Sequence, residues 1–241
     1  MADTLKYKRI VLKLSGESLS PAGELGVDPA TAKATAERLA PIAAAGVQMG
    51  IVVGAGNLVR GRHMADDAEI IHPTTADYMG MLGTVMNGIA LRDSLASCGV
   101  EAVVFSAFSV PLVCDLYHRS RVIEALEAGQ VAIFVGGTSH PGVTTDMCAA
   151  IRANDIDADA LLKATKVDGV YSADPQIDPD AEHFESISYD DVLAKKLGIM
   201  DLPAMAFCRD RAITTLVFNM NDPAAVLSAC RGETVGTVIR T

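Results

Sequence analysis

The sequence predicts an α/β fold of three layers, with helices on both faces of a mostly parallel central sheet. Short apolar segments rich in β-branched residues alternate with longer amphipathic segments through the first 135 residues. These apolar segments are nearly continuous in hydrophobicity, which is typical of strands covered on both faces. Hydrophobic residues make up 50% of the 241-residue chain, enough for a core that needs neither disulfides nor a metal.

The elements of the first half are bounded by caps and breakers. Asp28 followed by Pro29 indicates a helix start, because an Asp side chain caps free amide groups and proline fits the first helical turn. Gly46, Gly99 and Gly129 indicate helix ends. The expected strands are 9–14, 47–53, 102–105 and 131–135, and the expected helices are 29–45, 75–98 and 120–128.

The second half contains more turns. A short strand at 160–162 precedes the stretch 167–179, which is full of Asp, Gly and Pro. Further on, we expect helices at 188–197 and 223–229 and strands at 215–218 and 237–240. Without a repeat or linker, we expect one domain over 1–241, with an N-terminal lobe of about 1–153 and a C-terminal lobe of about 154–241 on one sheet.

The chain is acidic, with 20 Lys and Arg against 30 Asp and Glu and a formal net charge of −10. This balance argues against general binding of nucleic acid or anionic membrane. The charge is uneven, because residues 154–191 contribute −9 while residues 1–62 contribute +3. The same far-field argument would predict repulsion of free nucleotides.

Cysteine use and the apolar segments indicate a soluble cytoplasmic protein. The five cysteines form no C-x-x-C pair and suit a reducing compartment. The charged start lacks the apolar core of an export signal, and no apolar run approaches the length of a membrane span. Met79, Met81 and Met86, with Leu82, are interpreted as core filler on their helix.

A glycine-rich loop follows the second expected strand. Gly54 and Gly56 would let backbone N–H groups approach an anion, and Arg60 would add a bidentate charge. The spacing is neither the dinucleotide fingerprint nor a P-loop. A tight structural turn remains an alternative interpretation of this loop.

A lysine stands near the end of each of two other apolar strands. Lys13 and Lys163 are unusual there because lysine is almost never fully buried without a partner. Lys13 could instead extend its ammonium to solvent from the strand end. The turn residues Asp168 and Gly169 account for much of the sequence after Lys163, but not for the lysine itself.

The connection after the strand at 131–135 is rich in hydrogen-bonding groups. Residues 136–146 contain three glycines and four hydroxyl side chains. A helix cap by Thr144 or Thr145 would use only part of this capacity, so we expect an anion-binding loop. Together, cations and glycine loops at strand ends predict phosphoryl chemistry. The five histidines lack metal-ligand spacing, and no metal-ligating residues are predicted.

From Tyr7 to its end, the sequence resembles the bacterial UMP kinases (uridylate kinases) of the amino acid kinase family. This resemblance implies the amino acid kinase fold and transfer of the γ-phosphoryl of ATP to UMP, giving UDP and ADP, with Mg²⁺. It also implies a homohexamer that GTP activates and UTP inhibits. The matching segments are YKRIVLKLSGE (7–17), GAGNLVRG (54–61), DYMGML (77–82), TVMN (84–87), TTD (144–146), KATKVDGVY (163–171), ADP (173–175), MDL (200–202) and VFNMN (217–221).

The resemblance also assigns residues to ligands. Those expected to bind ATP are Lys13, Leu14, Ser15, Gly16, Gly56, Arg60, Thr165, Tyr171 and Asp174. Those expected to bind UMP are Ala55, Asp77, Thr138, Ser139, His140, Pro141, Gly142, Val143, Thr144 and Thr145. The segment tied to GTP consists of Pro21, Ala22, Gly23, Glu24, Leu25 and Gly26. Two positions depart from the family pattern: Ala55 replaces an expected glycine, and His140 replaces a residue that is often Asn.

The catalytic assignments combine this resemblance with charge arguments. Lys13 and Lys163 are expected at the transferring phosphoryl group and Arg60 at the phosphates across the gap. Asp146 is expected to orient a lysine or help hold Mg²⁺, and Asp201 is a second candidate for that organising role. Two alternatives stay open: another member of the fold that phosphorylates a carboxylate or carbamate, and a nucleotide-sensing regulator without turnover.

Overall fold

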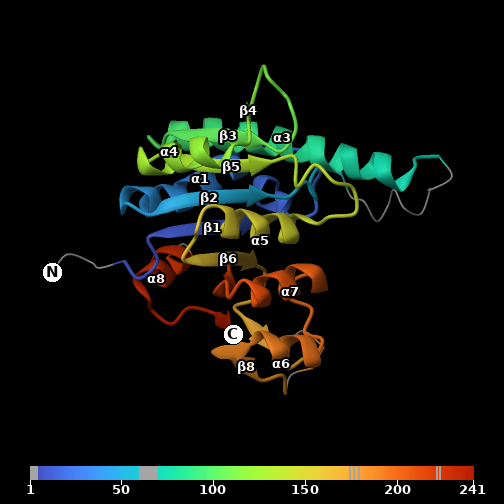
Figure 1. Cartoon of the computed structure of the whole chain (residues 1–241), viewed down its shortest axis with the longest axis vertical. Coiled ribbons are helices and arrows are strands. Elements are labelled where there is room, and N and C mark those ends of the chain that lie inside the picture. Colours follow the sequence, from blue (N-terminus) through green and yellow to red (C-terminus); the bar gives the residue numbers. More distant parts are fainter. Residues whose placement is uncertain are drawn as a thin grey trace.

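The chain folds around a nine-stranded sheet with helices on both faces (Figure 1). This computed structural model describes residues 5–59, 70–173, 175, 177–178, 180–220, 222 and 224–241. The strand order is β4-β3-β5-β2-β1-β6-β10-β11-β9, and every pair is parallel except β10 with β11. The strands are β1 (Arg9–Leu14), β2 (Gln48–Val53), β3 (Ala102–Ser106), β4 (Asp115–Leu116), β5 (Val131–Val135), β6 (Ala160–Thr165), β9 (Ser186–Ser188), β10 (Thr215–Asn219) and β11 (Thr237–Arg240).

The helices divide between the two faces of the sheet. One face carries α1 (Pro29–Ala44), α3 (Pro73–Ser97) and α8 (Ala225–Arg231), whose buried residues share one core cluster. The other face carries α4 (Arg119–Glu127), α5 (Thr145–Asp155), α6 (Tyr189–Ala194) and α7 (Leu202–Asp210). A short 3-10 helix, η1 (Gly16–Leu19), follows β1, and β7 (Val170–Tyr171) pairs with β8 (His183–Phe184) in a separate two-stranded sheet.

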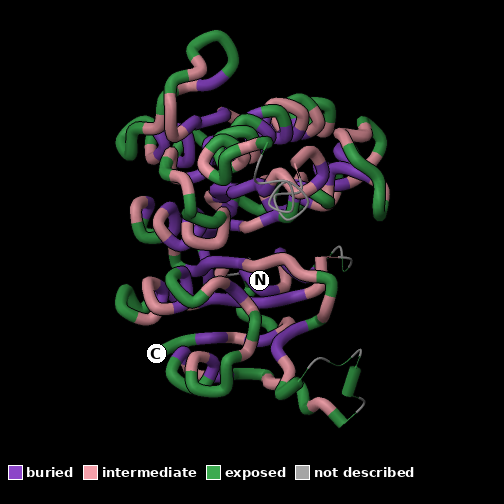
Figure 2. The backbone as a smooth tube through the Cα atoms, turned by 90° about the vertical axis from the view of Figure 1, so that its right-hand side faces the viewer, coloured by how far each residue is buried: buried purple, intermediate pink, exposed green. Residues whose placement is uncertain are grey.

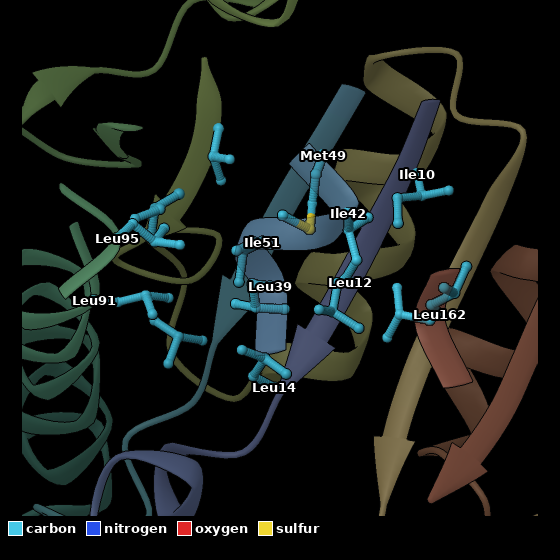
Figure 3. Close-up of a cluster of buried hydrophobic side chains, with 14 of the residues drawn as sticks. Ile10, Leu12, Leu14, Leu39, Ile42, Met49, Ile51, Leu91, Leu95 and Leu162 are labelled. Carbon is cyan, nitrogen blue, oxygen red and sulfur yellow. The ribbon is translucent and has the colours of Figure 1, made fainter. Parts of the chain in front are cut away.

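Alternation along the strands decides which side chains reach each face. Ile10, Leu12 and Leu14 of β1 enter the cluster under α1 and α3, where Figure 3 shows them beside aliphatic side chains of α1 and β2. Val11 enters the opposite cluster, under α5. Because strand side chains alternate in direction, Lys13 shares the face of Val11. The same argument places Lys163 of β6 on that face, after Leu161.

The predicted fold class is confirmed, and most predicted elements lie within a few residues of their expected bounds. Strand β6 continues past its predicted end to Thr165, because its register with β10 reaches Asn219. Helix α6 ends at Ala194 rather than 197, and Lys196 already has a left-handed φ of +53°. Helix α7 was not predicted, although Asp201 caps its first turn. Pro223, the predicted start of the last helix, lies outside the described residues.

The interpretation of the methionine-rich helix as core filler is largely wrong. Met81 is buried, but Met79, Leu82 and Met86 are 37%, 52% and 57% exposed. These three side chains lie on the face of α3 that turns away from the sheet, and apolar and polar residues are spread around this helix so evenly that its sequence gave no signal for its orientation. Figure 2 shows the general pattern, with buried strands at the centre and exposed segments around them. No described helix combines the length and apolarity needed to cross a membrane.

Candidate active site

The four polar clusters predicted from the sequence follow four adjacent strands. Because β5, β2, β1 and β6 are parallel neighbours in this order, their carboxyl ends meet at one edge of the sheet. The segments after them are, in that order, 136–145, 54–57, 15–16 and 166–173. Ligands of open α/β sheets bind at this edge.

Two lysines share one carboxylate at the centre of this edge. Lys13 of β1 is directly paired in register with Lys163 of β6. Asp146, in the first turn of α5, lies with one oxygen 3.0 Å from Lys13 Nζ and the other 2.5 Å from Lys163 Nζ. The three side chains are only 12–16% exposed. The structure thus holds two ammonium groups beside each other with a single negative charge between them.

Burial and the shared charge shift the pKa values of Asp146 and Lys163. Burial by itself would raise the pKa of Asp146, but Lys13 and Lys163 outweigh it and hold the pKa below its usual range. The pKa of Lys163 is lowered, because burial and the charge of Lys13 together outweigh the attraction of Asp146. Because one carboxylate neutralises two ammonium groups only in part, the cluster keeps a net positive charge that can attract a further anion.

Asp201 connects this cluster to α7. Its Oδ1 accepts a hydrogen bond of 2.9 Å from Ala204 N, and so caps α7. Its Oδ2 accepts a hydrogen bond from the hydroxyl of Thr144, which itself caps α5. Asp201 therefore fixes the start of the helix that carries Asp146, and it makes no direct ion pair with either lysine among the described contacts.

The glycine loop after β2 packs tightly against the segment after β1. A Cβ on Gly16 would lie 2.4 Å from Asn57 Oδ1 and 2.7 Å from the Gly54 carbonyl oxygen, so only glycine fits there. The Leu14 carbonyl accepts a 3.0 Å hydrogen bond from Gly54 N. The Leu14 side chain is fully buried in the core, which leaves only its backbone near the edge. Ser15 caps η1 by accepting from Glu17 N.

The loop 136–145 closes over a small cavity beside the glycine loop. Asp77 of α3 accepts a 2.7 Å hydrogen bond from Gly142 N and so holds this loop to the helix. The cavity of about 180 Å³ is lined by Ala55, Asp77, Thr84, Gly137, Val143 and Thr145. Of the predicted UMP residues, Ala55, Asp77, Val143 and Thr145 line this cavity, and Gly142 is bonded to Asp77 at its side. His140 turns back on its own loop, with Nδ1 3.0 Å from the Thr138 carbonyl oxygen.

The predicted ATP residues of the second half lie at the end of β6 and on the β7–β8 sheet. Thr165 donates to the Val167 carbonyl oxygen at 2.5 Å. The Tyr171 hydroxyl donates to Asp168 at 2.6 Å, and its ring meets His183 edge-on at 5.0 Å. Arg60 and Asp174, which were also predicted for this site, lie outside the described residues.

The segment 21–26, predicted to respond to GTP, touches the glycine loop. Gly26 N donates to the Asn57 carbonyl oxygen at 2.7 Å, and Asn57 Nδ2 returns a 2.7 Å hydrogen bond to the Gly26 carbonyl oxygen. Leu25 next to it is 69% exposed. The segment is therefore accessible on one side and bonded to the site on the other.

Sequence reasoning missed the buried polar residues that hold the loops. Asn57 and Asn87 are fully buried and bonded to each other, and Thr84 Oγ1 accepts from Gly136 N at 2.7 Å. Asn87 lies in the segment 84–87 that resembles the kinase family, yet nothing in the sequence around it indicated a contact with the glycine loop. A larger open hollow of about 890 Å³ lies by the C-terminal ends of α1, α3 and α4, where β2, β3 and β5 begin and therefore at the opposite end of these strands from the clusters.

The fold and this edge of lysines and glycine loops define a family of phosphotransferases. A model of the amino acid kinase family matches residues 8–219, and the chain belongs to this family.

Individual relatives narrow the comparison. The uridylate kinase of Pseudomonas aeruginosa is 49% identical over 234 residues, covering 97% of this chain and 95% of the relative. The uridylate kinase of Pseudomonas syringae pv. tomato is 48% identical, with 97% and 94% covered. Among solved structures, UMP kinase from Bacillus anthracis matches with a TM-score of 0.93 and 34% identity, covering 97% of this chain and 96% of that one. UMP kinase from Ureaplasma parvum matches with a TM-score of 0.90 and 34% identity, covering 98% of this chain and 100% of that one.

Proposed function

We propose that this protein is a UMP kinase, which transfers the γ-phosphoryl group of ATP to UMP and releases UDP and ADP. The observation that carries the proposal is the pair of lysines on one buried carboxylate, next to a glycine loop and a cavity walled by Asp77. UMP is proposed as the acceptor because the relatives named uridylate kinase are 48–49% identical over nearly the whole chain.

The chemistry needs charge neutralisation more than it needs a base. The acceptor is a phosphate oxygen of UMP, which is already an anion near neutral pH, so the enzyme need not create the nucleophile. Two unit charges about 4 Å apart repel by roughly 4 kcal/mol at an effective dielectric of 20. Lys13 and Lys163 would offset this repulsion at the transferring phosphoryl group, with Arg60 at the phosphates across the gap.

Asp146 and Asp201 act in this proposal as organisers of the cations. Asp146 holds the two ammonium groups in fixed positions, because each of its oxygens faces one lysine. Asp201 fixes Thr144 and thereby the helix start that carries Asp146. Preorganised charges of this kind stabilise a transition state without reorganisation during the reaction.

The two lobes would then divide the substrates. The N-terminal lobe, about 1–153, offers the cavity of loop 136–145 and α3 to UMP. The C-terminal lobe, about 154–241, offers the end of β6 and Tyr171 to the adenosine end of ATP. Lys13 of the central strand stands where the lobes meet, which suits transfer between two bound nucleotides.

Mg²⁺ belongs to the proposal as a companion of ATP. Among the described residues no group of three His, Cys, Asp or Glu side chains is placed to hold a metal. Mg²⁺ in kinases is usually held by substrate phosphates with one or two carboxylates, and it would neutralise phosphate charge here. Asp146 faces both lysines, and Asp201 accepts hydrogen bonds from Ala204 N and Thr144, so either carboxylate would serve such a complex in addition to these partners.

Regulation, assembly and location are the finer parts of the proposal. Activation by GTP is supported by the hydrogen bonds that join Gly26 of segment 21–26 to Asn57 of the glycine loop. Inhibition by UTP, a homohexamer and a cytoplasmic location rest on the resemblance to the family alone. The regulation can be measured by initial rates with added GTP or UTP, and the assembly by light scattering of the purified protein.

The test is a coupled assay of ADP release with four acceptors. We expect ADP release with UMP and none above background with acetylglutamate, aspartate or carbamate. Activity with one of the latter would instead assign the protein to another reaction of the same fold. If UMP and ATP bind but no UDP forms, with or without GTP, the protein is a nucleotide-sensing regulator and the proposed kinase function is wrong.

A further inference from the structure

The glycine loop 54–57 rests on helix α3, the same helix that carries Asp77. The contact has two parts, one steric and one made of hydrogen bonds. The steric part joins Ala55 to Gly83, and the hydrogen bonds join Asn57 and Gly54 to Asn87. None of these pairs is needed to form the helix or the strand by itself.

The steric part leaves no room for a second methyl group. A Cβ built on Gly83 would lie 2.9 Å from the Cβ of Ala55 and 3.6 Å from the Cβ of Leu58. Carbon atoms in contact are optimal at about 3.5–4.0 Å, so a methyl on Gly83 would require a retreat of roughly 1 Å. Both atoms are fixed to the main chain, and no rotamer change can relieve the clash. Ala55 therefore fits its loop because residue 83 is glycine.

The hydrogen-bonded part is a reciprocal pair of buried amides. Asn57 Nδ2 donates to Asn87 Oδ1 at 3.1 Å, and Asn87 Nδ2 donates to Asn57 Oδ1 at 2.7 Å. Asn87 Nδ2 also donates to the Gly54 carbonyl oxygen at 2.7 Å. Both asparagines are fully buried, so each lost hydrogen bond would leave a polar group without water.

We propose that Gly83 and Asn87 are positioning residues, which set the distance between the glycine loop and the acceptor wall of α3. Asp77 stands on the same helix and holds loop 136–145 through Gly142. One helix thus fixes two loops that face the same cavity, and Ala55 and Gly83 form a matched pair where the glycine loop touches that helix. This inference rests on the proposed function, because it assigns the cavity to the phosphoryl acceptor.

The first experiment is a cycle of four full-length proteins: wild type, Ala55→Gly, Gly83→Ala and the double variant. Misplacement of reacting groups by about 1 Å can cost on the order of 100-fold in rate. We expect Gly83→Ala to lower kcat for UMP phosphorylation by at least about tenfold. Ala55→Gly serves as the reference for the rescue, and the double variant should return to within about threefold of its kcat. Thermal unfolding of the four proteins should show the same rescue.

A control separates the clash from the general effect of replacing glycine in a helix. Gly80→Ala lies on the same helix, and a Cβ there would meet no atom within 4 Å. Because Gly80 lines the cavity, this control is used for thermal unfolding without substrate only, where it measures the effect of helix propensity. An equally active Gly83→Ala, or a double variant no better than Gly83→Ala, would overturn the pairing.

The second experiment is Asn87→Asp, whose test is a pH profile. The introduced carboxylate can accept from Asn57 but cannot donate to the Gly54 carbonyl oxygen, so we expect a fall in kcat of about tenfold at neutral pH. Once protonated, the carboxyl can donate again, and the ratio of variant to wild-type kcat should rise as the pH is lowered. A ratio that stays constant with pH would overturn the role of Asn87.

The two proposals fail in different ways. A wild-type protein that does not phosphorylate UMP would overturn the proposed function. The unfolding cycle would still decide whether Ala55 and Gly83 are a matched pair, because it needs no substrate.

Discussion

The site has two halves that are built in different ways. The half proposed for the acceptor, made of the loops after β2 and β5 with α3, is held by fully buried Asn57 and Asn87 and by the Thr84 to Gly136 hydrogen bond. The half proposed for the donor, made of the end of β6 and the β7–β8 sheet, combines a buried hydrogen bond from Val170 N to Thr237 with bonds that face solvent, such as Tyr171 to Asp168. The acceptor half is therefore held by more buried polar side chains than the donor half.

The acidic excess belongs mainly to the second of these halves. Residues 154–191 carry −9 of the net −10, whereas Lys13 and Lys163 stand at the strand edge itself. Charges more than about 8 Å apart are largely screened at physiological salt. The net charge therefore argues against binding of nucleic acid. It does not determine whether a nucleotide binds in a pocket with two lysines at its centre.

Removing the carboxylate between the halves should have the largest effect. Asp146→Asn leaves Lys13 and Lys163 without a counter-charge, and breaking a buried ion pair from one side costs about 3 kcal/mol of unfolding free energy. Denaturant unfolding at pH 7 measures this loss. Because the folded-state pKa of Asp146 is lowered, its contribution is present above about pH 4 and disappears as the pH falls through the lowered pKa.

The exposed Asp93 is the control for this variant, because it is 69% exposed in its side chain. Asp93→Asn should change the unfolding free energy by less than about 0.5 kcal/mol. If Asp146→Asn were as stable as wild type at pH 7, the two halves would not depend on their shared carboxylate.

Removing the lysine of the central strand tests the chemistry rather than the fold. Lys13→Ala should lower kcat by at least roughly 100-fold, the size typical of losing one electrostatic stabiliser. Initial rates of ADP release with saturating UMP and ATP measure it. Lys33→Ala, at an exposed position of α1, should leave kcat unchanged. An unaltered kcat in Lys13→Ala would remove this lysine from the mechanism.

A change confined to the acceptor half should affect the KM for UMP more than the KM for ATP. Asp77→Ala removes the acceptor for Gly142 N and frees loop 136–145 from α3. We expect the KM for UMP to rise about tenfold, the effect of one charge-assisted hydrogen bond, and the KM for ATP to change much less. Equal rises in both constants would show that the halves are not independent.

The smallest expected effect is a shift of a pH profile in the donor half. The lowered pKa of Lys163 means that its positive charge begins to be lost below the ordinary lysine value of 10.5. The alkaline decline of kcat/KM should therefore begin below that value, since kcat/KM reports the free enzyme. In Lys163→Arg the guanidinium stays charged, and the decline should move to higher pH. An unmoved decline would assign it to another group.

Much of the fold could be predicted, and so could the location of most of the site. Apolar runs and caps gave β1, α1 and β5 within a residue or two, because these signals are local. Glycine loops and lysines after strands predicted that these residues gather at one edge, because the carboxyl ends of adjacent parallel strands meet there. The orientation of α3 escaped prediction, since nearly all of its residues are small or apolar. The support from Asn87 escaped because its partners are 30 and 33 residues away in sequence.

By itself, the sequence determined the layers, the parallel sheet and the residue types that can neutralise phosphate. These follow from hydrophobic periodicity and from chemistry that each side chain carries alone. Only the tertiary structure decided that Lys13 and Lys163 stand in register across two strands and share Asp146. It also decided that Gly83 must lack a side chain where Ala55 has one. Such pairings depend on strand register and helix placement, which arise from the packing of the whole core and not from any one segment.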